Sequence, residues 1–512
     1  MSSTYPTLQD LVTFRRLKVG PIIIERRRMK APYTLTHHDG RVTANEFIYT
    51  YDERVFDSKV PESINLASML AVQVAMNYGL FCEELEFDGL YDQVDQRFIR
   101  DMVENTSREI YVNKFLSENE FLLAPFNALP TQRLSKYTAA RIGFSNTAYT
   151  QYKLHDSQPD CDHNRYLILS SGGKDSLLSY GVMKELGKDV HPVFINESGR
   201  HWFTAINAYR YLRDAEPNTA RVWCNSDRVF AWMLRQMPFI RQDFADVRAD
   251  IYPIRLWTVA VFLFGVLPLA HQRRVGRILI GNEYDTTLNL DHHGITHYAA
   301  LYDQSKYFDN ALTRYYQKKG WGMYQFSILR SLSELLILAI LVNRYPHLQQ
   351  QQVSCHAAHE RDGRIYPCGN CEKCRRIVGM LQALDADPTR CGYTSNQIVK
   401  ALKSLEQKKV KQLGMDAAYL YHLLLTKSII ARNAHTERLA KPFDFIMKLR
   451  FDSLRSDLQD MPSDIREELI SIFLEYAGSA VVQVNRRWIP FDVLNAEAIH
   501  KPYRYQNNGK ES

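Results

Sequence analysis

At residues 166–176 the chain reads Tyr-Leu-Ile-Leu-Ser-Ser-Gly-Gly-Lys-Asp-Ser. The apolar run Tyr166–Leu169 predicts a buried strand, and the spacing of apolar residues from Leu177 to Leu186 predicts a helix. Between them, Gly172 and Gly173 have no Cβ, so their backbone N–H groups can approach an anion closely. The helix N-terminus adds partial positive charge at the same point. The stretch therefore predicts a cradle for phosphate groups, and a serine-glycine surface turn is the alternative.

The side chains of this turn point to a metal-bound nucleotide. Lys174 would add a full positive charge, and Ser171 and Ser176 would add hydroxyl donors. A carboxylate such as Asp175 repels a polyphosphate unless a cation lies between them, which makes Mg²⁺ a natural companion of the ligand. We expect Ser176 also to cap the helix.

Strands and helices alternate after the cradle. Apolar strands are predicted at Val190–Ile195, Ala220–Cys224 and Gly276–Ile280, with helical stretches between them. This order is typical of an α/β protein with a doubly wound parallel sheet. In such sheets ligands lie beyond the carboxyl ends of the strands, which adds Asn196 and the loop Gly281–Asp285 to the candidate site. In that loop Glu283 and Asp285 are candidates for metal or substrate binding, and a plain strand-to-loop turn is the alternative.

The predicted nucleotide-binding set follows from these positions. It comprises Ser170, Ser171, Gly172, Gly173, Lys174, Asp175, Ser176, Asn196, Gly281 and Asn282.

A second motif is formed by four cysteines at 355, 368, 371 and 374. Twelve residues separate Cys355 from Cys368, and two residues separate each later pair. Closely spaced thiolates of this kind fit a tetrahedral structural zinc site, which has no open position for water. His356 or His359 in place of Cys355, or an iron-sulfur cluster, are the alternatives.

The chain divides into three predicted regions. Residues 1–160 contain a strand near 47–56 and a helix near 63–78, which indicates an N-terminal α+β domain. Residues 161–390 hold the nucleotide-binding domain, including a zinc knuckle at 355–374. Residues 391–512 are predicted to form a helical C-terminal region.

The segment 291–297, with three histidines, is interpreted as a polar active-site loop, or otherwise a surface loop.

Composition places few limits on partners. The 64 basic and 57 acidic residues leave a net charge of +7, a small excess for 512 residues, so nucleic acid is open as a partner but not favoured. The apolar run 256–270 is shorter than the roughly 20 residues of a membrane span and predicts a buried helix. No secretory signal is visible at the N-terminus, and we expect a cytoplasmic protein without a membrane partner. A homodimer or a protein partner is left open.

The motif Ser171-Gly172-Gly173-Lys174-Asp175-Ser176 resembles the signature of the PP-loop ATP pyrophosphatase superfamily. Together with the cysteines, residues 165–380 are similar to the 7-cyano-7-deazaguanine synthase family, whose members are shorter and usually lack the lysine. The cradle, Gln304-Ser305-Lys306 and Ser327-Ile328-Leu329-Arg330 also resemble the ATP-dependent epimerase of the UDP-N-acetylmuramoyl dipeptide.

These resemblances imply an enzyme that adenylates a small-molecule carboxylate or carbonyl, converting ATP to AMP and pyrophosphate. Amidation, nitrile formation or epimerisation would follow. The implied catalytic residues are Lys174, Asp175 and Ser176, with magnesium on Asp175, zinc on the four cysteines and Asn196 facing the adenosine. The alternatives are a tRNA-modifying PP-loop enzyme, which would use Arg26–Arg28 and Lys408–Lys411 on RNA, and a non-catalytic nucleotide-binding component of a defence or signalling complex.

Overall fold

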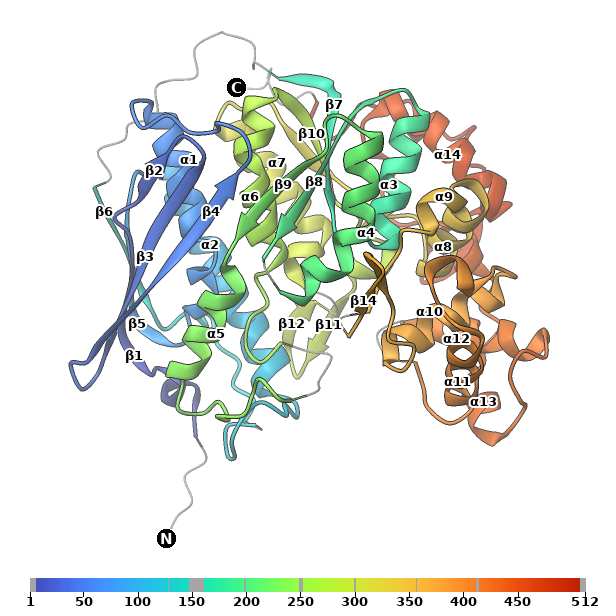
Figure 1. Ribbon diagram of the computed structural model, residues 1–512, viewed down its shortest axis with the longest axis horizontal. Helices are drawn as coiled ribbons and strands as arrows, with labels where there is room; N and C mark the ends of the chain where they lie inside the picture. The colour runs from blue at the N-terminus through green and yellow to red at the C-terminus, as the bar shows by residue number, and fades with distance from the viewer. Residues whose placement is uncertain are drawn as a thin grey trace.

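The computed structural model describes residues 6–127, 129–146, 161–197, 199–247, 252–298, 301–355, 357–410 and 414–506. They form an α/β structure around one large, mostly parallel sheet (Figure 1). The strands of this sheet follow the spatial order β13-β10-β7-β8-β9-β4-β3-β1-β5-β6, with β2 paired to β3. Their bounds are β1 (Phe14–Val19), β2 (Ile23–Glu25), β3 (Arg28–His37), β4 (Val42–Tyr51), β5 (Cys82–Asp88), β6 (Arg141–Ser145), β7 (Asp162–Ser170), β8 (Asp189–Asn196), β9 (Ala220–Cys224), β10 (Val275–Leu279) and β13 (Tyr324–Phe326).

Helices cover the parallel part of the sheet on both faces, as the alternation of strands and helices predicts. Tyr166 and Ile168 of β7 point into the core that contains α3, α4 and α8, whereas Leu167 points into the core that contains α6. Burial on both faces explains the continuous apolar run of this strand. The helices are α1 (Pro61–Ala71), α2 (Gln93–Ile110), α3 (Lys174–Glu185), α4 (Arg200–Ala215), α5 (Ser226–Gln236), α6 (Val259–Gln272), α7 (Lys306–Lys318), α8 (Glu334–Arg344), α9 (Pro346–Gln349), α10 (Glu372–Ala383), α11 (Ser395–Leu405), α12 (Gly414–Thr426), α13 (Ala434–Leu439) and α14 (Ser463–Ala477).

The N-terminal strands belong to the same sheet as the cradle strand. β4 pairs antiparallel with β9, with Tyr49 opposite Cys224. The hydroxyls of Tyr49 and Tyr51 donate to the carbonyl oxygens of Val261 and Gly265 in α6, at 2.6 and 2.8 Å. The sheet and α6 therefore connect the regions on either side of residue 160. The predicted boundary lies at the edge of residues 147–160, which are outside the described residues.

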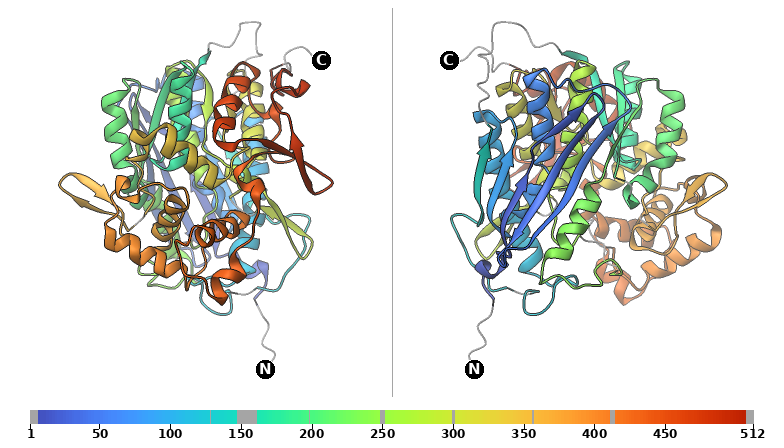
Figure 2. Two further views of the ribbon diagram at one scale, coloured as in Figure 1. Left: turned by 90° about the vertical axis from the view of Figure 1, so that its right-hand side faces the viewer. Right: turned by 60° about the vertical axis from the view of Figure 1, so that its left-hand side comes forward.

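The C-terminal region contains a small sheet in addition to its helices. Strands β16 (Leu449–Phe451), β17 (Ala480–Val484) and β18 (Arg487–Phe491) lie on the side of the molecule away from the N-terminal strands (Figures 1 and 2). A tight turn with positive φ at Asn485 and Arg486 joins β17 to β18. The prediction of a helical region missed this hairpin because its strands are short and its turn lacks glycine.

The apolar run near 256–270 forms the buried helix α6, as predicted. None of the helices in the described parts of the chain combines the length and the apolarity that crossing a membrane requires. The first turn of α6 is capped from a distance by Asp303, whose Oδ2 accepts the N–H groups of Thr258 and Ala260 at 2.9 and 3.0 Å. Burial raises the pKa of Asp303 to about 7, despite these donors.

This buried carboxyl predicts a pH-dependent stability. The folded pKa lies above the unfolded value, so the stability contributed by Asp303 is complete below about pH 4 and is lost as the pH rises toward about 7. Asp303→Asn keeps an acceptor for the two N–H groups but cannot ionise. Urea titrations at several pH values give the free energy of unfolding. Between about pH 5 and 7 this free energy should fall by roughly 2 kcal/mol more in the wild type than in the variant. Parallel pH profiles would contradict the prediction.

Candidate functional site

The turn after β7 depends on Gly172. Its φ is +72°, in the region that side chains rarely adopt. A Cβ at this position would lie 3.0 Å from the Cα of Ala205 and 3.1 Å from the Cβ of Ala208, because α4 packs directly over the turn. Both the backbone conformation and the close approach of α4 require glycine here.

Helix α3 begins at Lys174, three residues earlier than the apolar spacing predicts. Gly173 is the N-cap residue and the first intrahelical bond runs from the Leu177 N–H to the Gly173 carbonyl at 3.1 Å. The prediction that Ser176 caps the helix is wrong, because Ser176 lies inside the first turn and donates to the Gly173 carbonyl at 3.2 Å. The N–H groups of the first turn have no acceptor within the helix and are directed toward the turn.

Lys174 lies at the centre of three carboxylates from three elements. Its Nζ is 2.7 Å from Asp175 of the same helix, 3.1 Å from Glu334 at the start of α8 and 3.3 Å from Glu283 after β10. The Lys174 side chain is 7% exposed, while that of Asp175 is 28% exposed. Asp175 is therefore the member of this group that solvent reaches most easily.

The charged groups around Lys174 differ in how burial and neighbouring charges shift their pKa values. Burial disfavours the charged amine, but the three carboxylates more than offset it and raise the pKa of Lys174 above its ordinary value. Burial and the neighbouring carboxylates raise the pKa of Glu283 well above its ordinary value. Lys174 and Arg376 lower the pKa of Glu334 despite its burial. Lys174 is charged, and Glu283 is the carboxyl that takes up a proton most readily.

The loop after β10 meets the first turn of α3, as its position at a strand end predicts. A Cβ on Gly281 would lie 2.6 Å from the Cβ of Asp175, so glycine allows this approach. Asn282 is buried, and its backbone exchanges hydrogen bonds with the Ser327 hydroxyl at 3.1 and 2.7 Å. These contacts hold Glu283 against Lys174.

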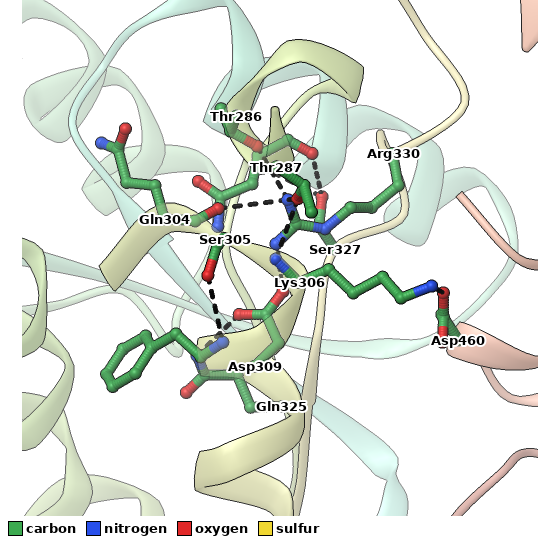
Figure 3. Close-up of polar contacts among 12 residues, drawn as sticks. Thr286, Thr287, Gln304, Ser305, Lys306, Asp309, Gln325, Ser327, Arg330 and Asp460 are labelled. Atoms are coloured by element: carbon green, nitrogen blue, oxygen red, sulfur yellow. Dashed lines mark hydrogen bonds and ion pairs between the residues drawn. The ribbon is translucent and has the colours of Figure 1, made fainter. Parts of the chain in front are cut away.

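The motifs at 304–306 and 327–330 come together beside Thr286 and Thr287, which follow this loop in the chain (Figure 3). The guanidinium of Arg330 donates to the hydroxyls of Thr286 and Thr287 at 2.7 and 3.0 Å, to the Gln304 carbonyl at 3.1 Å and to Asp309. Lys306 pairs with Asp460 at 2.6 Å. Because these charged groups satisfy one another, their evident role is to fix the loop that carries Glu283.

Sequence reasoning missed two acidic residues of the site. Glu334 opens the otherwise apolar helix α8, and a charge at the start of such a helix is a usable signal. The N–H of Glu334 donates to Asp416 of α12 at 3.0 Å. Burial raises the pKa of Asp416 to about 7. Nothing in the local sequence of Asp416 indicates that it reaches the cradle.

Asn196 and the histidine segment are not among the residues that pair with Lys174. Asn196 ends β8 and lines a groove of about 320 Å³ with Arg28, Thr50, Asp52, Arg221 and Trp223. The histidine segment forms a hairpin of β11 (Asn289–His292) and β12 (Ile295–Tyr298). It contacts the N-terminal region, where the Tyr298 N–H donates to Glu109 at 3.1 Å. These contacts favour the surface-loop interpretation over the active-site loop.

The four predicted cysteines meet in one cluster. The sulfur atoms of Cys355, Cys368, Cys371 and Cys374 all lie within 4.8 Å of one another, so they could bind a metal ion such as zinc. The Sγ–Sγ distances are 3.5 Å for Cys371–Cys355 and 3.9 Å for Cys368–Cys374. Zinc–sulfur bonds of about 2.3 Å in a tetrahedron require sulfur–sulfur distances of about 3.8 Å. The spacing fits one tetrahedral ion better than an iron-sulfur cluster, which would hold the sulfurs farther apart.

Backbone geometry around the cysteines also suits a metal. Cys371 is the N-cap of α10 and accepts the Cys374 N–H at 3.4 Å, while Cys368 accepts the Asn370 N–H at 3.4 Å. Hydrogen bonds from neighbouring thiols and N–H groups lower the pKa of Cys368 to about 6. His359 is exposed in β14 (His359–Arg361) and stacks on Tyr366, so it is not among the clustered ligands. His356 lies outside the described residues.

The metal cluster and the cradle are linked through α10. This helix starts at the cysteine cluster, and Arg376 in its second turn lies 3.9 Å from Glu334. Fixing the start of α10 therefore fixes a cation beside the Lys174 group.

The turn geometry predicts a selective effect of adding one methyl group. Gly172→Ala should lower the free energy of unfolding by about 2 to 4 kcal/mol, since it combines an unfavourable φ with a contact against the α4 backbone. Gly187→Ala is the matched control, with a φ of +67° and nothing within 4 Å of the added atom, and should cost about 1 kcal/mol. Urea titrations measure both. Equal losses would show that the α4 contact is unimportant.

The cysteine cluster predicts a metal-dependent fold. Cys371→Ser should reduce bound zinc well below one ion per chain and lower the melting temperature by at least about 5 °C, because one of the four ligands is lost. Cys161→Ser, outside the cluster, should keep both values. Elemental analysis and thermal unfolding give the result, and a variant with full zinc content would argue against the cluster.

Neither a protein-family model nor a curated protein matches the chain.

Proposed function

We propose that this protein is an ATP-dependent enzyme of the PP-loop type that adenylates a small-molecule carboxylate or carbonyl. The observation that carries the proposal is the arrangement around Gly172. A turn with positive φ, the N–H groups of α3 and the charged Lys174 meet at the carboxyl end of a parallel strand. Anions and nucleotides bind at this position in α/β proteins.

The roles of the residues follow from their places in the site. Backbone N–H groups of Ser171, Gly172 and Gly173 would hold the β and γ phosphates of ATP. Lys174 would neutralise the negative charge that develops there during reaction. Asp175, the most exposed of the three carboxylates, would bind the Mg²⁺ of the Mg-ATP substrate, with Glu283 and Glu334 beside it.

The chemical step we propose is displacement at the α-phosphorus. An oxygen of the substrate carboxylate forms a bond to this phosphorus, and the bond from phosphorus to the bridging oxygen of the β-phosphate breaks. That oxygen keeps the electron pair and leaves as part of pyrophosphate. The products are an acyl adenylate and pyrophosphate. In amidation, ammonia attacks the acyl carbon, loses a proton and displaces AMP. In epimerisation, the adjacent carbon loses a proton and regains one on the opposite face, and water then attacks the acyl carbon and displaces AMP.

The cysteine cluster has a structural role in this proposal. Four thiolates around one zinc ion leave no open position at which the metal could activate water. The zinc would hold the start of α10, and thereby Arg376, near Glu334. In this proposal the reaction takes place at the cradle, and the zinc site only stabilises the structure beside it.

The proposal predicts the products of ATP cleavage. With α-labelled ATP, Mg²⁺ and a metabolite extract, the wild type should form AMP and pyrophosphate. Asp175→Asn should lower this rate by about a hundredfold or more, because the Mg²⁺ ligand is lost. Lys184→Gln is the control on the same helix, since Lys184 pairs with Glu216 at 2.6 Å in the last turn.

Circular dichroism should show the same folded state in both variants. Formation of ADP and phosphate, or an unchanged rate in Asp175→Asn, would count against the proposal.

A further inference from the structure

Arg450 is a fully buried cation of the C-terminal region. It lies in the middle of β16, its side chain is 0% exposed, and its three nitrogens have no hydrogen-bond partner among the described residues. The nearest anions are Asp416 at 3.7 Å and Asp285 at 3.9 Å, beyond hydrogen-bonding distance. Its guanidinium carbon lies 4.1 Å above the ring centre of Tyr284. Burying five N–H donors without acceptors is costly.

Three other buried arginines form hydrogen bonds through their terminal nitrogens. Arg466, also 0% exposed as a residue, donates to the carbonyl oxygens of Met461, Ala498, Ile499 and Lys501 at 2.6–3.0 Å. Arg277 donates to both carboxylate oxygens of Asp464 at 2.8 Å. The terminal nitrogens of Arg330 donate hydrogen bonds to two threonine hydroxyls, the Gln304 carbonyl and the carboxylate of Asp309 (Figure 3). Arg450 differs from these three arginines because its guanidinium forms no hydrogen bond with the described residues and has only the two longer ion pairs with Asp416 and Asp285.

Arg450 is connected to the cradle by short steps. Its backbone N–H donates to the Ser331 carbonyl at 2.9 Å, which attaches β16 to the segment before α8. Tyr284 and Asp285, beside its guanidinium, follow Glu283 directly in the chain. Asp416 accepts from the N–H of Glu334, which pairs with Lys174. A molecule touching Arg450 would therefore lie next to the Lys174 group.

We propose that Arg450 binds a carboxylate group of the acceptor substrate and orients that substrate toward the cradle. The planar guanidinium can donate two parallel hydrogen bonds to the two oxygens of a carboxylate. This inference rests on the proposed function, because the substrate would be the one that is adenylated.

A binding experiment tests this role without knowledge of the natural substrate. The probes are ¹⁴C-labelled acetate, succinate and benzoate, and equilibrium dialysis with the full-length chain measures their dissociation constants. At least one probe should bind to the wild type, and Arg450→Met should weaken its binding at least about tenfold. Arg450→Lys, which keeps the charge but not the two parallel donors, should give an intermediate value. Arg344→Met is the control, because Arg344 pairs with Glu185 and Glu475 on the surface.

Nucleotide binding separates this inference from the proposed function. Calorimetry with α,β-methylene-ATP should give dissociation constants within about twofold of each other for the wild type and Arg450→Met. A wild type that binds a carboxylate probe through Arg450 but does not bind the nucleotide would refute the proposed function alone. Binding of no probe by the wild type, or equal binding by Arg450→Met, would overturn the role of Arg450.

Discussion

The ion group around Lys174 is the interaction on which the site depends. An ammonium ion removed from water is unfavourable unless nearby opposite charges replace its hydration. Here the replacement comes from α3, from the loop after β10 and from α8. Removing any one of these elements would leave Lys174 with fewer carboxylates to offset its burial. The electrostatic requirement of one lysine therefore ties together segments that are more than 150 residues apart.

Several other features serve this group. Gly172 and Gly281 allow α4 and the β10 loop to approach at distances that a Cβ would prevent. Arg330 donates hydrogen bonds to Thr286 and Thr287 and so fixes the loop that carries Glu283. The cysteine cluster fixes the start of α10, the helix that places Arg376 beside Glu334. The continuation of the sheet through β9 and β4 gives the cradle strand a wide and rigid support. Rigid elements hold charged groups in position with little loss of free energy when a ligand arrives.

The sequence was sufficient for the features that depend on neighbouring residues. The strand-turn-helix of the cradle, the parallel strands after it and the cysteine spacing all follow from local pattern, and the structure contains the corresponding elements. It was insufficient where distant segments meet. Glu334, Asp416 and Arg450 approach the cradle only through tertiary packing, and no periodicity indicates such contacts. The helix start was misplaced because Lys174, Asp175 and Ser176 are polar, and apolar spacing alone cannot detect a polar first turn.

The charge of the site also constrains its ligand. Three carboxylates lie within 3.3 Å of one ammonium group, and Arg376, at 3.9 Å from Glu334, adds a second positive charge. Burial and the neighbouring carboxylates raise the pKa of Glu283, so this carboxyl is the one at which a proton would relieve the excess negative charge. A divalent cation would relieve the same excess without a proton. A bare polyphosphate would add to it, whereas Mg-ATP brings its own cation to the carboxylates and presents its phosphate oxygens to the N–H groups of the turn. Under the proposed function, the acidic side of the site would therefore meet the cation of Mg-ATP, and the helix N-terminus would meet its phosphates.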